Sequence, residues 1–114
     1  GLGDVYKRQA DTMADLAANV NGVNDATVVI AGGNAYVGLD LDDKVQRNEA
    51  ERVERNVYNV LNRYVNRYNV TITSDADMFG RLRDIGDGIR DGAPLDRYQN
   101  DFRTFDNRFR TFTR

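Results

Sequence analysis

The chain has 114 residues and a formal net charge of −2, and 40% of its residues are hydrophobic and 30% charged. This length suits a single domain with a packed core, and the slightly acidic balance argues against a generally basic nucleic-acid-binding protein. Histidine and cysteine are both absent, which excludes disulfides, cysteine or histidine zinc sites, thiol nucleophiles and serine–histidine–aspartate triads.

The beginning of the chain contains a segment without periodicity and then a helical pattern. Residues 1–9 show neither a helical nor a strand period and lack the apolar core of a signal peptide. We therefore expect them to be a non-native or disordered tail. Apolar residues then recur at helical spacing and predict a short amphipathic helix over residues 10–20: Met13, Leu16, Ala17 and Val20.

Three segments have the character of β-strands. Residues 26–31 are β-branched and apolar, and Gly32-Gly33 supplies a two-residue turn that requires positive φ. In residues 35–41, apolar side chains alternate with Tyr36, Gly38 and Asp40, which predicts a strand with one buried face. A third strand is predicted over residues 70–73, where two threonines flank and separate the apolar residues.

Two longer helices are expected around the third strand. Asp43 and Gln46 resemble a capping pair at the start of a helix over residues 44–68, which carries one apolar stripe. Residues 74–77 form a second capping signature before another helix. Gly86 and Gly88 each cost that helix about 1 kcal/mol relative to alanine, so its second half is expected to kink or fray.

The order α-β-β-α-β-α predicts an α+β domain over residues 10–92. We expect a three-stranded sheet with helices on one face, and the third strand beside the first after a right-handed crossover. Leu39 and Leu61 are predicted core residues, because each lies on the apolar side of its element.

Residues 93–114 differ in composition and predict a C-terminal amphipathic helix. Its aromatic residues follow the alternating spacing of a coiled-coil seam and must cover something: either the domain's own sheet or long helix, or a partner protein, a second copy or a membrane. Five arginines and three aspartates give residues 94–114 a net charge of +2, which suits an anionic lipid, cell-wall polymer or nucleic acid, or simply a solvated face. The candidate interaction surface comprises Leu95, Tyr98, Phe102, Arg103, Phe105, Arg108, Phe109 and Phe112.

No arrangement of residues predicts catalysis, a metal or a cofactor. Asp40, Asp42 and Asp43 are clustered carboxylates, but they lack the glycine and the terminal glutamate of a calcium loop. Asp84, Asp87 and Asp91 are typical of a solvated, ion-paired helix face. Gly32-Gly33-Asn34 lacks the glycine pattern of a phosphate loop.

Several segments together resemble the YhcN/YlaJ family of sporulation lipoproteins. The resemblance covers roughly residues 11–114. It is carried by residues 23–29 and 34–40, by Val70-Thr71-Ile72-Thr73-Ser74-Asp75-Ala76-Asp77 with the following Phe79-Gly80-Arg81-Leu82, and by Gly92-Ala93-Pro94-Leu95, which leads into the phenylalanine-rich tail. It implies a secreted protein of spore-forming bacteria, attached to a membrane by a lipid on an N-terminal cysteine. The signal peptide and that cysteine are absent from this sequence, which we interpret as an N-terminal truncation. The predicted order of elements also resembles ring-building and BON-type modules.

We therefore expect a non-catalytic protein of the spore membrane or envelope, lipid-anchored in its full-length form. It would act by binding a protein partner or by self-association during sporulation or germination, with no nucleic-acid partner. Two alternatives remain open. One is an enzyme that acts on cell-wall glycan through two carboxylates about 5–10 Å apart, and the other is nucleic-acid binding by the arginine- and phenylalanine-rich tail.

Overall fold

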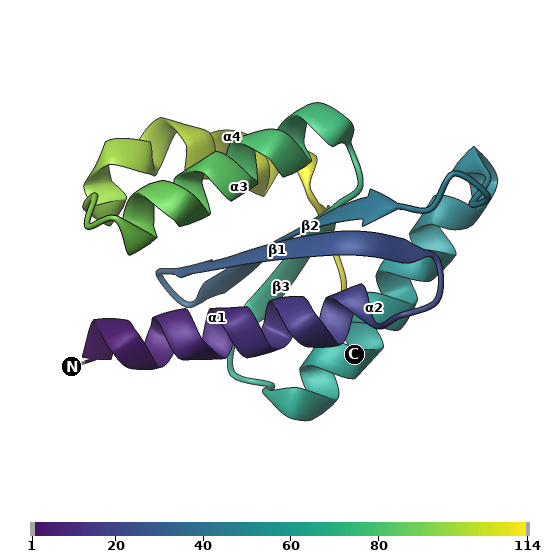
Figure 1. The fold of residues 1–114 in the computed structure, drawn as a ribbon, viewed down its shortest axis with the longest axis horizontal. Coiled ribbons are helices and arrows are strands. Elements are labelled where there is room, and N and C mark those ends of the chain that lie inside the picture. Colours follow the sequence, from purple (N-terminus) through teal and green to yellow (C-terminus); the bar gives the residue numbers. More distant parts are fainter. Residues whose placement is uncertain (1, 114) are drawn as a thin grey trace.

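The computed structural model describes residues 2–113, which form an α+β fold with a mixed four-stranded sheet (Figure 1). This agrees with the predicted fold class. Two short 3-10 helices, Arg47–Glu49 and Leu95–Tyr98, precede α2 and α4. The main elements in chain order are α1 (Leu2–Ala18), β1 (Val23–Ala31), β2 (Asn34–Leu41), α2 (Ala50–Tyr64), β3 (Asn69–Thr73), α3 (Ala76–Arg90), α4 (Gln99–Arg108) and β4 (Arg110–Thr111).

Helices cover both faces of the sheet, where the sequence predicted helices on one face. Figure 1 shows α1 and α2 on one side of the strands and α3 and α4 on the other. The hydrophobic core is divided accordingly: Val37 and Leu61 belong to the cluster beneath α1 and α2, whereas Tyr36 and Ile85 belong to the cluster beneath α3 and α4. The prediction of one buried face in residues 35–41 is therefore wrong, because β2 is buried on both faces from Ala35 to Leu39.

The third strand lies beside the second strand and not beside the first. The sheet order is β1-β2-β3-β4, with β1 antiparallel to β2 and β3 parallel to β2. The physical reason lies in the strands themselves. β2 is apolar enough on both faces to lie inside a sheet, whereas β1 carries Asn24 and Asp25 near its start and has an irregular register between Val23 and Asp25. The polar and bulged strand remains at the edge.

The hairpin and the core agree with the sequence analysis. Gly32 and Gly33 form the turn with φ of 58° and 80°, the left-handed region that glycine enters without strain. Leu39 and Leu61 are fully buried. Asp75 caps α3, since its Oδ1 accepts a hydrogen bond of 3.0 Å from the Met78 backbone N–H.

The expected tail over residues 1–9 is corrected by the structure, in which residues 2–9 are the first turns of α1. Asp4 lies in the first turn, where a negative charge favours a helix. At the other end of this segment, Gln9 accepts hydrogen bonds from Tyr68 Oη and, at 3.2 Å, from Arg67 Nη2. These contacts hold the early turns of α1 against the residues that follow α2.

The helix predicted over residues 44–68 is shorter than expected. Gln46 and Glu49 form a capping box before α2, while Asp42 accepts a hydrogen bond from the Lys44 N–H. Asp43 is therefore not the capping residue, and Val65 is already extended. Conversely, α3 is one continuous helix as far as Arg90 and does not fray at its glycines. Packing requires glycine at position 88, since a Cβ there would collide with Tyr98.

Candidate functional site

The eight residues of the predicted interaction surface are divided between the interior and the surface. Four of them are buried, Phe102 is half-buried, and Leu95, Arg103 and Arg108 are exposed. The buried members are Tyr98, Phe105, Phe109 and Phe112. The aromatic seam therefore docks on the domain's own sheet, and its buried members are not available to a partner in this fold.

The seam does not lie on a single helix, as the sequence predicted, but on both faces of the sheet. Phe105 and Phe109 stack with ring centroids 4.7 Å apart and pack around Tyr36. Helix α4 ends at Arg108, and Phe112 lies on the opposite face, where it stacks on Tyr58 at 5.6 Å. Extended backbone at β4 allows the chain to pass around the edge of the sheet, which a continuous helix could not do.

Polar contacts fasten α4 to the sheet and to α3. Tyr36 Oη donates a hydrogen bond of 2.7 Å to Asp106 Oδ1, and burial together with this bond raises the pKa of Tyr36 well above its usual range. Arg81 donates two hydrogen bonds, of 2.9 and 2.8 Å, to the Asp101 carboxylate. These bonds lower the pKa of Asp101 below its usual value.

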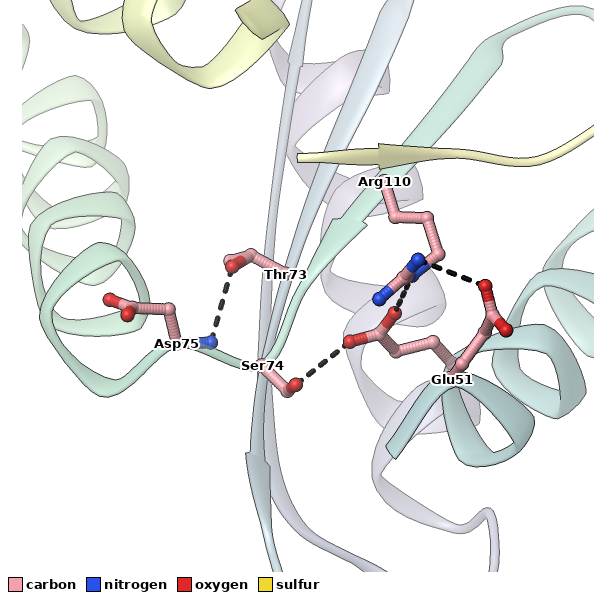
Figure 2. A network of polar contacts seen from close by, with 6 residues as sticks. Glu51, Thr73, Ser74, Asp75 and Arg110 are labelled. Carbon is pink, nitrogen blue, oxygen red and sulfur yellow. Dashed lines mark hydrogen bonds and ion pairs between the residues drawn. The ribbon is translucent and has the colours of Figure 1, made fainter. Parts of the chain in front are cut away.

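A second polar network ties β4 to α2 (Figure 2). Glu54 is only 3% exposed and accepts hydrogen bonds of 2.8 Å from Ser74 Oγ and from Arg110 Nε. Arg110 also donates to Glu51 at 2.9 Å, and the bond to Glu54 raises the pKa of Arg110. The sequence analysis did not single out Glu54. The available signal was its position on the apolar stripe of α2, three residues before Val57 and seven before Leu61.

A concave surface lies along the outer edge of β1, and we call it the edge groove. Its cavity volume is about 520 Å³, and it is lined by residues 3–14 of α1, 26–30 of β1 and 83–90 of α3, together with Leu95. In Figure 1, β1 lies in front of the other strands with α1 below it and α3 above it. The walls contain several small residues, among them Ala10, Ala14 and Gly86.

Four charged side chains that line the edge groove, Asp11, Arg83, Asp87 and Arg90, form ion pairs. Arg90 forms ion pairs with Asp11 of α1 and, at 3.9 Å, with Asp87 of its own helix. Arg83 forms an ion pair of 2.7 Å with Asp25. Among residues 2–113 there is no group of three or more acidic side chains placed to hold a metal ion. The two carboxylates lining the groove, Asp11 and Asp87, share a single arginine.

Comparison with known proteins shows the family. Residues 4–110 match the family described as sporulation lipoprotein YhcN/YlaJ. The chain belongs to the YhcN/YlaJ family. A relative in Bacillus subtilis strain 168, described as "Probable spore germination lipoprotein YlaJ", is 33% identical over 86 residues, which are 75% of this chain and 41% of the relative. This YhcN/YlaJ chain thus corresponds to less than half of that protein.

The family match includes both ends of the fold. It begins at residue 4, within the part of α1 that the sequence analysis set aside, and continues to residue 110, at the start of β4. A lipoprotein family implies membrane anchoring and an extracytoplasmic location for the full-length protein. Within residues 2–113, none of the helices of this YhcN/YlaJ chain has the length and apolar character needed to span a bilayer.

Proposed function

We propose that this YhcN/YlaJ chain is a non-catalytic binding module of the spore membrane or envelope, active in assembly during sporulation or in germination. Its membership of the family over residues 4–110 carries the proposal. The name of the Bacillus subtilis relative adds germination as the stage at which binding matters. Anchoring of the full-length protein would hold the module at a membrane surface and raise its effective concentration near envelope partners.

The character of the edge groove supports binding in preference to catalysis. General acid–base chemistry needs a carboxyl group free to exchange a proton with a substrate. Asp11 and Asp87 are both engaged by Arg90, and the groove runs along residues 26–30 of the edge strand β1. Such a surface offers shape, backbone hydrogen bonds and small apolar side chains, which are the means of recognising a partner.

Co-sedimentation tests the proposal. The purified 114-residue chain is mixed with membrane and envelope fractions isolated from spores, and the bound fraction is measured against protein concentration. Saturable retention is expected for the wild-type chain. Leu39→Asp is the matched control, because it places a charge in the fully buried core and should abolish retention by unfolding the domain. A wild-type chain that is strictly monomeric and is not retained by any fraction would overturn the proposal.

A further inference from the structure

The outer edge of β1 carries main-chain groups that point away from the sheet. At Ala26, the N–H donates a hydrogen bond of 2.8 Å to Asp25 Oδ1, and Arg83 Nη2 approaches the carbonyl oxygen at 3.5 Å. Both groups are thus directed outward and not toward β2. Because outward and inward groups alternate along an edge strand, those of Val28 and Ile30 also point outward. Within the described residues 2–113, no side chain forms a hydrogen bond with the outward main-chain groups of Val28 and Ile30.

Two helices extend beyond this edge on either side of it. α1 and α3 lie on opposite faces of the sheet, yet Asp11 of α1 and Arg90 of α3 form an ion pair. Since both residues line the edge groove, this ion pair joins its two walls. The edge groove is therefore a slot with main chain at its floor, helices as its walls and an ion pair across its opening.

From this geometry, and building on the proposed function, we infer that the edge groove binds one extended polypeptide strand of a protein partner, which pairs with the outer edge of β1. A ligand that satisfies alternating N–H and C=O groups on a strand edge is another strand. A second copy of this chain fits less well, because its own α1 and α3 would meet those of the first copy before the two β1 edges came within the about 4.8 Å of strand pairing.

The walls of the edge groove define the side chains that the partner strand should carry. Successive side chains of an added strand point to opposite faces of the sheet. On one face they would meet Ala10 and Ala14, and on the other Gly86 and Ile89. Small walls leave room for β-branched residues, and the strand should therefore be apolar at its centre.

The two ends of the edge groove favour acidic residues in the partner strand. Arg83 and Arg90 are seven residues apart on α3, or about 10 Å along the helix, which is the length of about three residues of strand. Carboxylates of the partner could replace Asp25 and Asp11 as their ion-pair partners. The side chains of Arg90 and Asp11 are 56% and 51% exposed, and exposed ion pairs of this kind contribute little to stability. Opening the slot therefore costs little.

A synthetic peptide in which valine and threonine alternate between two terminal aspartates provides the probe. Binding to the full chain is measured by fluorescence anisotropy, and amide hydrogen exchange locates the bound peptide. We expect exchange to slow at Val28 and Ile30, whose N–H groups point outward, and to stay unchanged at Val29, which already pairs with Tyr36 of β2.

Gly86→Gln tests the slot itself. A Cβ at Gly86 would lie 3.6 Å from Val29 Cγ2, which is an ordinary contact, so this position accepts a Cβ. Because Gly86 lines the edge groove, a longer side chain there is expected to occupy part of it. The expected result is about tenfold weaker peptide binding. Gly80→Gln is the matched control: it makes the same change on the same helix, no atom lies within 4 Å of its Cβ, and it should leave binding unchanged.

The inference would be overturned by no binding of the peptide, by equal binding by the Gly86→Gln variant, or by protection at amides away from β1. Protection of Val28 and Ile30 that rises with protein concentration in the absence of peptide would also overturn it, since the occupant would then be a second copy. Equal retention of wild type and Gly86→Gln on envelope fractions contradicts this site and leaves the proposed function standing. If the wild-type chain binds the peptide but is not retained by any envelope fraction, the proposed function is contradicted and this site stands.

Discussion

At Gly88 in α3, helix propensity and tertiary packing predict opposite effects on stability when a single methyl group is added. Alanine in place of glycine inside a helix is favourable by about 1 kcal/mol. At Gly88, however, the new Cβ would lie well inside contact distance of Tyr98 Oη and 3.2 Å from Cζ of the same ring. Tyr98 is buried, and overpacking of this kind costs about 1–3 kcal/mol. The expected net effect of Gly88→Ala is therefore a loss of about 1 kcal/mol.

Gly80 provides the comparison, because a Cβ there meets no atom within 4 Å. Gly80→Ala should stabilise the protein by up to about 1 kcal/mol. Urea unfolding followed by circular dichroism at a common m-value measures both changes. Tyr98→Phe removes the colliding oxygen and should restore most of the stability lost in Gly88→Ala. Equal stability of the Gly80→Ala and Gly88→Ala variants, or the absence of coupling to Tyr98→Phe, would refute the packing argument.

Three further predictions concern the contacts that hold the C-terminal segment. Phe105→Asp should abolish the native circular dichroism spectrum, since it exchanges a buried ring for a charge; a folded variant would mean that the segment does not dock on the sheet. Glu54→Ala removes the acceptor of the Ser74 and Arg110 hydrogen bonds and should lower the free energy of unfolding by about 1.5–3 kcal/mol; an unchanged urea midpoint would contradict this. The ion pair with Arg81 lowers the pKa of Asp101 below its usual value of 3.8. The stability that this ion pair contributes is therefore present above about pH 4 and is lost as pH falls through the pKa of Asp101 in the folded protein. Asp101→Asn should flatten the acid side of the stability–pH curve and should cost at most about 1 kcal/mol at pH 7.

The interaction surface shows how far sequence reasoning can reach. The spacing of the aromatic residues correctly indicated that they must cover apolar surface. It did not reveal that Phe105 and Phe112 cover opposite faces of the sheet, because a period of three and four is compatible with one helix seam. The edge groove could not be predicted at all. It brings together Ala14, Val28 and Gly86, which are far apart in the chain and individually unremarkable.

Local chemistry in the amino-acid sequence was sufficient to predict several features of the elements. Glycine at positions 32 and 33 defined the hairpin turn, Asp75 defined the start of α3, and apolar periodicity identified Leu39 and Leu61 as core residues. These features depend on neighbours within a few residues, so the chain encodes them locally. Only tertiary packing decided that β3 lies beside β2, that helices cover both faces, and that a groove runs along the edge of β1. Strand order and layering depend on which apolar surfaces compete to be buried, and that competition involves the whole chain at once.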